Sequence, residues 1–164
     1  MKTTIMDSES KIHKEIDLVQ DVIKRMSQNS FQVKSWLIAI LTAIVVIGKD
    51  GILVNQDTKI NAIALNIFLL LPIFCFWYLD AFFLSKERLY RELYKWIIKH
   101  RRSNPELYLY DLNTFEREVG SEKEYLNLEK NKTKNSIFNP TLMSFYMIPT
   151  IFVFGLLIWN IFLS

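Results

Sequence analysis

The sequence predicts an all-α integral membrane protein with three transmembrane helices, an amphipathic N-terminal helix and a helical cytoplasmic region. Three long apolar stretches carry this prediction: Phe31–Gly48, Ala62–Leu84 and Ser144–Leu163. The hydrocarbon core of a bilayer is about 30 Å thick, and about 20 mostly apolar residues cross it as a helix. Most charged residues lie between these stretches, which divides the chain into four parts: 1–30, 31–84, 85–143 and 144–164.

Residues 8–30 have the apolar spacing of an amphipathic helix. A seam of apolar side chains recurs there at steps of four and three: Ile12, Ile16, Val19, Ile23 and Met26. Such a seam is typical of a coiled coil or of a helix that docks on another helix. Two interpretations follow. Either the seam joins another copy or a partner protein, or it packs against the protein's own cytoplasmic helices.

The first apolar stretch is marginal in length for a membrane span. Its uninterrupted apolar run, Trp36–Gly48, is about 20 Å long as a helix. It crosses a bilayer only if Phe31–Val33 join it and the Lys34 ammonium reaches the interface along its aliphatic stem. The alternative is a buried or interfacial helix. Asn29-Ser30, just before this stretch, predicts either a break in the helix or a polar patch on it.

The second apolar stretch is expected to continue as a helix beyond the membrane. Turn residues at Gly48-Lys49-Asp50-Gly51 and a short connection precede it, so the first two spans should form an antiparallel hairpin. Between Pro72 and Pro105 the chain contains neither Gly nor Pro. One helix is therefore predicted from about Ala62 to Arg101, with Pro72 as a site for a kink.

The region after this helix has weaker signals. Ser103-Asn104-Pro105 should end the helix, and Leu107–Leu112 predicts an irregular or short extended segment. Short helices are expected over Thr114–Val119 and Glu122–Lys130. Asn139-Pro140 is a start signal for the last helix, with Asn as the cap and Pro at the first helical position.

The distribution of basic residues predicts the orientation. Of the 20 Lys and Arg residues, six lie in residues 1–34 and twelve in residues 86–141, and the remaining two are Lys49 and Lys59. The positive-inside rule then places the N-terminus and residues 85–143 in the cytoplasm and the C-terminus outside. No signal-peptide pattern precedes the first span, so we expect an uncleaved anchor in the inner, cytoplasmic membrane.

Asp80 is the most unusual residue of the apolar stretches. A carboxylate inside a membrane is costly and is a functional-site hypothesis by default. Asp80 lies four residues before Leu84, however, and so close to the expected interface. There it can cap a helix or pair with a basic side chain such as Lys34. We favour this structural role over an ion or proton site.

A second candidate site is the basic segment that follows the second span. Its basic side chains, Lys95, Lys99, Arg101 and Arg102, accompany Trp96. Proximity to the membrane favours anionic lipid headgroups as the ligand, and a phosphorylated small molecule is the alternative. Nucleic acid is anionic like these two ligands, but we do not expect it as a partner.

The sequence contains no recognisable enzyme motif. His13 and His100 lack the spacing of metal ligands, and neither a Gly-rich phosphate loop nor a nucleophile elbow is present. The single cysteine, Cys75, excludes a disulfide framework within the chain. We therefore expect no catalytic residue, no metal and no cofactor.

A run of residues at the end of the second span resembles a recurrent signature of small bacterial three-span membrane proteins of uncharacterised function. The run is F-W-Y-L-D-A-F-F-L-S-K-E-R-L-Y-R-E-L-Y at Phe76–Tyr94. The resemblance extends to Asn29-Ser30-Phe31 with Lys34-Ser35-Trp36 and to Ser144-Phe145-Tyr146. More distantly, the layout is similar to that of the SLATT-type effectors, which accompany bacterial anti-phage genes and are regarded as membrane-perforating. SLATT proteins usually have two spans, whereas this chain has three predicted ones.

This resemblance implies an oligomeric membrane effector in bacterial antiviral defence that forms pores or disrupts the membrane. Three helices cannot enclose a water path alone, so a pore would need several copies of the chain. The expected partners are membrane lipids, further copies and a cytosolic signalling or sensor protein. The alternative is a membrane anchor or scaffold that recruits a cytosolic partner and conducts nothing itself.

Overall fold

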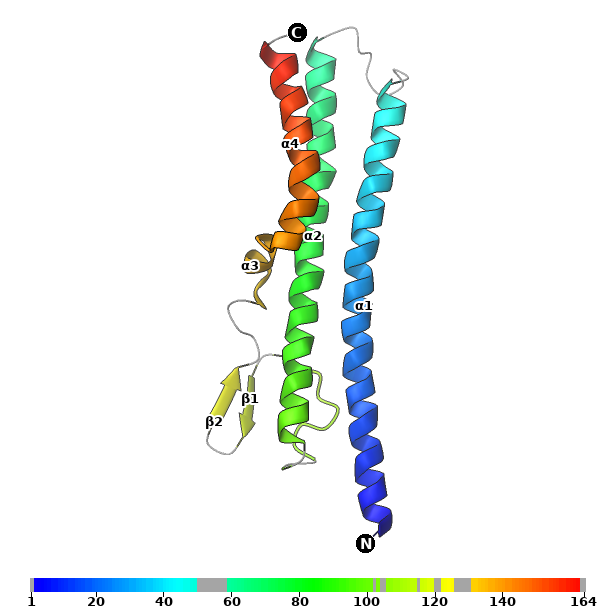
Figure 1. The fold of residues 1–164 in the computed structure, drawn as a ribbon, viewed down its shortest axis with the longest axis vertical. Coiled ribbons are helices and arrows are strands. Elements are labelled where there is room, and N and C mark those ends of the chain that lie inside the picture. Colours follow the sequence, from blue (N-terminus) through cyan, green and yellow to red (C-terminus); the bar gives the residue numbers. More distant parts are fainter. Residues whose placement is uncertain are drawn as a thin grey trace. The chain divides into compact units, whose positions relative to one another are not determined.

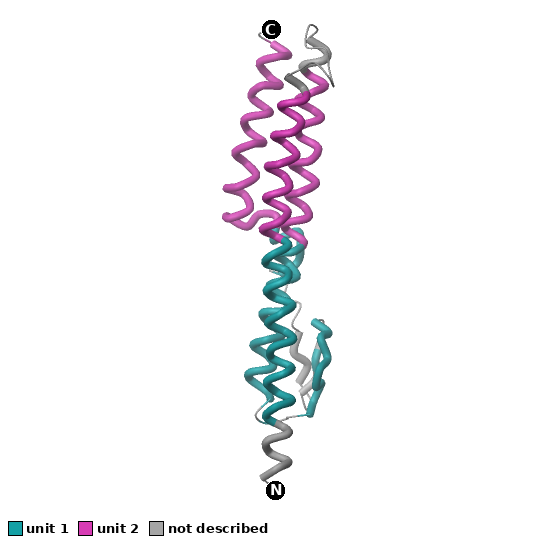
Figure 2. The backbone as a smooth tube through the Cα atoms, turned by 90° about the vertical axis from the view of Figure 1, so that its right-hand side faces the viewer, with its two compact units in different colours: residues 1–29, 83–136 teal, residues 30–82, 137–164 magenta. Residues whose placement is uncertain are grey.

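The computed structural model describes residues 2–49, 59–101, 103, 106–114, 116–119, 122–125 and 131–162. Its elements in chain order are α1 (Lys2–Lys49), α2 (Lys59–His100), β1 (Glu116–Val119), β2 (Glu122–Tyr125), α3 (Thr133–Ile137) and α4 (Pro140–Phe162) (Figure 1). They form two compact units, each built from two pieces of the chain (Figure 2). We name them the polar unit, Met1–Asn29 with Phe83–Ser136, and the apolar unit, Ser30–Phe82 with Ile137–Ser164.

Among the described residues, three helices are long and apolar enough to cross a membrane. They include the segments Glu9–Ile47, Ile63–His100 and Pro140–Phe162. This confirms the three apolar helices predicted from the sequence and fits a membrane location. Large apolar side chains stay exposed on these helices, among them Leu71, Ile148 and Phe152, as expected for surfaces that face lipid.

Helix α1 joins two elements that the sequence analysis treated separately. It runs from Lys2 to Lys49 without interruption, so the predicted amphipathic helix and the first span are one helix. Asn29-Ser30 is therefore a polar patch on the helix and not a break. Helix α2 likewise matches the single helix predicted from about Ala62 to Arg101, with Pro72 inside it.

The two short strands correct one prediction. β1 and β2 pair antiparallel, with Glu116 opposite Tyr125 and Val119 opposite Glu122. The short helices expected over Thr114–Val119 and Glu122–Lys130 are thus wrong where the strands lie, and residues 126–130 lie outside the described residues. The sequence between the strands, Gly120-Ser121, is a pair favoured in two-residue hairpin loops.

The start of α4 follows the predicted cap. The backbone N–H of Thr141 donates a hydrogen bond to Asn139 Oδ1 at 3.0 Å, and Pro140 is the first helical residue. Pro at this position loses nothing, because its missing N–H would have no partner within the helix. The helix begins four residues before the apolar stretch at Ser144.

Candidate functional site

The Asp80 carboxylate is the centre of a polar cluster in the apolar unit, where three helices meet. Its side chain is 0% exposed. Lys34 Nζ of α1 lies 2.5 Å from Asp80 Oδ2, and the Tyr146 hydroxyl of α4 donates to the same oxygen at 3.0 Å. Ser30 of α1 donates a hydrogen bond to Oδ1. The structure thus forms the Lys34 pair considered from the sequence and adds two neutral donors.

Lys34 is held in place by more than its opposite charge. Its ammonium also donates to Ser30 Oγ at 2.9 Å, so one serine hydroxyl contacts both members of the ion pair. The Lys34 side chain keeps 22% of its surface exposed, whereas that of Asp80 keeps none. A buried carboxylate is tolerated when every lone pair finds a donor. Lys34, Ser30 and Tyr146 together supply three donors to the two oxygens of Asp80.

Aromatic stacking supports the position of Tyr146. Its ring lies parallel to that of Trp77, with an interplanar angle of 2° and centroids 5.8 Å apart. Trp77 Nε1 in turn donates to the carbonyl of Ile137 at 3.1 Å. The hydroxyl of Tyr146 has a second acceptor at 3.3 Å, the carbonyl of Phe76. These contacts fix α4 against α2 and direct the Tyr146 hydroxyl towards Asp80.

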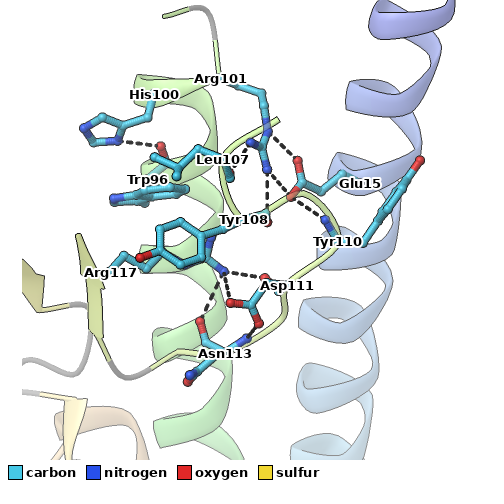
Figure 3. A network of polar contacts seen from close by, with 10 residues as sticks. All are labelled: Glu15, Trp96, His100, Arg101, Leu107, Tyr108, Tyr110, Asp111, Asn113 and Arg117. Atoms are coloured by element: carbon cyan, nitrogen blue, oxygen red, sulfur yellow. Dashed lines mark hydrogen bonds and ion pairs between the residues drawn. The ribbon is translucent and has the colours of Figure 1, made fainter. Parts of the chain in front are cut away.

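A second buried ion pair lies in the polar unit (Figure 3). Arg101, directly after α2, forms a two-point contact with the Glu15 carboxylate of α1, with Nε donating to Oε2 at 2.7 Å and Nη2 to Oε1. The side chains are 4% and 1% exposed. Two parallel N–H···O bonds are the strongest geometry that a guanidinium offers a carboxylate. The pair therefore ties the N-terminal half of α1 to the end of α2.

The same ion pair organises the turn after α2. Arg101 Nη1 donates to the carbonyl of Leu107 at 2.5 Å, and the backbone N–H of Tyr110 donates to Glu15 Oε1 at 3.1 Å (Figure 3). Tyr108 and Tyr110 both adopt positive φ, 55° and 61°. Non-glycine residues enter this left-handed region only when their surroundings favour it. The ion pair supplies that constraint and explains the irregular segment expected at Leu107–Leu112.

Arg117 of β1 lies between two aromatic rings in the polar unit. Its guanidinium carbon is 4.5 Å from the Trp96 ring centroid and 5.0 Å from that of Tyr108. Nη2 donates to the carbonyls of Asp111 and Asn113 (Figure 3). Burial lowers the pKa of the Arg117 guanidinium, and the Asp111 carboxylate at 3.8 Å opposes that shift. The hairpin is thereby attached to α2 through a cation–π contact.

The seam predicted on residues 8–30 faces the chain's own core. Val19 is fully buried with Leu93, Trp96 and Ile97 of α2, and Ile16 and Ile23 pack against this cluster. Ile12 and Met26 are partly buried. Of the two interpretations, the structure thus shows intramolecular packing for the middle of the seam, where Val19 is fully buried and Ile16 and Ile23 are partly buried.

The basic segment divides into residues with different surroundings. Arg101 was expected to bind anionic lipid, but it is buried and paired with Glu15, so this part of the expectation is corrected. Lys95 lies 3.2 Å from Glu92 and stays largely exposed, and Lys99 is exposed as well. Arg102 lies outside the described residues. The spacing along the sequence could not reveal which cation meets a carboxylate 86 residues away.

The sequence analysis missed four residues that build these clusters: Glu15, Ser30, Arg117 and Tyr146. A signal existed for Glu15, because it lies beside the apolar seam and not on the opposite face of the helix. Among the described residues, no group of three side chains is arranged to hold a metal ion.

Comparison with known protein families, curated proteins and solved structures finds no match for this chain.

Proposed function

We propose that this chain is an oligomeric membrane effector of bacterial antiviral defence whose closed form is held by the Asp80 cluster. The observation that carries the proposal is the fully buried carboxylate joined to Lys34, Ser30 and Tyr146. Charged groups inside a membrane are rare, and those that persist commonly belong to a functional element. The likeness of the chain's layout to that of the SLATT-type effectors supports the same class of activity.

The cluster acts as a latch in this proposal. With the ion pair closed, its charged groups face one another, and apolar side chains such as Leu71, Ile148 and Phe152 are exposed. A water path then requires several copies and a rearrangement of the helices that the latch holds together. Opening the latch frees these helices to move against one another.

A cytosolic signalling or sensor protein provides the trigger. Helices α1 and α2 each contribute residues to both units, so force on the polar unit acts on helices that carry the latch. We place the polar unit and the N-terminus in the cytoplasm, the C-terminus outside and the chain in the inner membrane. This orientation follows the distribution of basic residues.

The alternative function is a membrane anchor or scaffold that conducts nothing. The observation in its favour is the polar unit itself, in which two buried arginines hold a helix, a turn and a hairpin in one arrangement. A rigid module of this kind suits recruitment of a cytosolic protein. In this reading the Asp80 cluster only keeps the three apolar helices together.

Membrane potential in cells that carry the complete native locus distinguishes the two functions. We expect infection by a phage that triggers the locus to depolarise the membrane, as read by a potential-sensitive dye. Lys34→Met should depolarise it without infection, because the latch loses its cation. Ser35→Ala, which alters a neighbouring exposed hydroxyl bonded to the Phe31 carbonyl, is the control and should behave as the unchanged chain.

Three results would contradict the proposal. Absence of depolarisation during infection, while a cytosolic protein still co-purifies, would favour the anchor. A Lys34→Met protein that inserts normally and causes no depolarisation without infection would show that the Asp80 cluster is not a latch. Loss of depolarisation in Asp80→Asn at unchanged expression would make Asp80 part of the ion path and not part of a latch.

A further inference from the structure

A basic pocket of about 380 Å³ lies on the polar unit. Its lining residues are Arg88, Arg91, Glu92, Lys95 and Asn131. Four of them come from consecutive turns of α2, and Asn131 comes from the segment just before α3. Three cations and one carboxylate line this pocket, so a small anion is the ligand that its charge suits.

Asn131 supplies the observation that points to a ligand. The residue is 3% exposed, yet its side-chain Nδ2 has no hydrogen-bond partner among the described residues. Its backbone is fixed, because Ser85 Oγ donates to the Asn131 carbonyl at 2.5 Å. A buried amide N–H₂ without an acceptor destabilises the fold, because it has lost its bonds to water and gained none. An acceptor that enters the pocket would remove this cost.

The cations of the pocket differ in their own pairing. Arg91 lies 2.7 Å from Glu87 and Lys95 lies 3.2 Å from Glu92, each along the helix. Arg88 makes no ion pair and no hydrogen bond with the residues that the structure describes. Its guanidinium therefore has its donors available. An arginine fork together with an amide N–H₂ is a donor set typical of phosphate recognition.

The position along the chain brings the pocket near the expected membrane surface. Arg88 follows Leu84, the last residue of the predicted second apolar stretch, by four residues, which is about 6 Å of helix. Phosphate groups of lipids lie at this level beside a helix that leaves the bilayer.

We infer that this pocket binds a phosphate group, held by the Arg88 guanidinium and the Asn131 amide, with Arg91 and Lys95 as supporting charges. The phosphate belongs either to an anionic lipid headgroup or to a soluble phosphorylated molecule. This site differs from the one expected at Lys95–Arg102, because Arg101 is committed to Glu15. It stands independently of the effector and anchor functions.

The test uses the full-length protein in a non-ionic detergent, with binding read by native mass spectrometry. The probes are short-chain phosphatidylglycerol, inorganic phosphate and a diacylglycerol of equal chain length that lacks phosphate. We expect phosphatidylglycerol or inorganic phosphate to bind and diacylglycerol not to bind. Binding of inorganic phosphate at concentrations similar to the lipid identifies a soluble source, and preference for phosphatidylglycerol identifies the lipid headgroup.

Substitutions then locate the site. Asn131→Asp keeps the size of the side chain but replaces the donor with a negative charge, and Arg88→Gln removes the fork. Each should weaken binding about tenfold or more. Lys99→Gln removes one exposed cation of the same helix outside the pocket and should change affinity less than about threefold.

Two results would overturn the inference. One is equal weakening by Lys99→Gln and Arg88→Gln, which would show attraction to charge without a site. The other is diacylglycerol binding as tightly as phosphatidylglycerol while inorganic phosphate fails to bind. Circular dichroism checks the fold of each variant, and Arg88→Gln, at a partly exposed position, keeps the test decisive if Asn131→Asp misfolds.

Discussion

Glu15 and Arg101 are 86 positions apart in the sequence and form a buried, two-point ion pair (Figure 3). This contact holds the N-terminal half of α1 at the end of α2, and it also sets the backbone of the turn that follows. Apolar packing around Val19 brings the two helices together but does not fix their register along one another. The ion pair fixes that register, because its two-point geometry is satisfied in only one.

Removal of the Glu15 charge should destabilise the polar unit strongly. Glu15→Leu leaves the Arg101 guanidinium buried without its carboxylate, which costs about 3–5 kcal/mol for pairs of this kind. Asp17→Asn, on an exposed position of the same helix, is the matched control and should cost less than about 0.5 kcal/mol. Urea unfolding followed by tryptophan fluorescence measures both, and equal stabilities would refute the role of the pair.

Arg117→Lys should weaken the attachment of the hairpin. Lysine keeps the charge but lacks the planar group that lies between Trp96 and Tyr108, so we expect a loss of about 1–2 kcal/mol. The near-ultraviolet circular dichroism of Trp96 should change with it. An unchanged spectrum together with unchanged stability would mean that any cation serves at this position.

The two members of the Lys34–Asp80 pair should respond unequally to substitution. Lys34→Met leaves the fully buried Asp80 carboxylate without its cation, whereas Asp80→Asn leaves Lys34, which is 22% exposed, able to reach the interface. We expect Lys34→Met to cost about 3–5 kcal/mol and Asp80→Asn to cost clearly less, with the protein still inserted. The double variant should be more stable than Lys34→Met in detergent unfolding, and additive losses would contradict the coupling.

Tyr146→Phe isolates the contribution of one hydroxyl. The substitution removes the donors to Asp80 and to the Phe76 carbonyl but keeps the ring that stacks on Trp77. We expect a loss of about 1–3 kcal/mol in stability, because the acceptor is a buried carboxylate. A loss below about 0.5 kcal/mol in the same unfolding assay would show that Lys34 and Ser30 satisfy Asp80 without it.

Reporter fusions test the orientation. Because 18 of the 20 basic residues fall in residues 1–34 and 86–141, fusions after Asn55 and at Ser164 should report an external location. A fusion at Gly120 should report the cytoplasm. An external Gly120 would reverse the orientation or change the number of spans.

The three apolar helices could be predicted from the sequence because their signal is length and composition alone. The long α2 and the Asn139 cap were predictable for a similar reason, since the absence of Gly and Pro and the Asn-Pro pair are local features. The sequence also indicated that Asp80 could pair with a basic side chain such as Lys34, and the two are in contact in the structure.

The other contacts between residues distant in sequence have no local signal in the sequence. Arg101 resembled its exposed neighbours in sequence, and only the fold shows that Glu15 removes it from solvent. Short helices were predicted where the hairpin lies. The Glu, Lys and Arg residues there are good helix formers, but Arg117 packs between the rings of Trp96 and Tyr108 from a strand. Here a tertiary contact overrides local propensity.

The Asp80 cluster has a consequence for the order in which the ribosome delivers its members. Lys34 and Ser30 are synthesised before Asp80, whereas Tyr146 emerges 66 residues after it. The first two apolar helices can therefore match their opposite charges before the last helix is made. Helix α4 then adds the hydrogen bond from Tyr146, so a chain truncated before α4 would keep the Lys34 and Ser30 contacts of Asp80 and lack that of Tyr146.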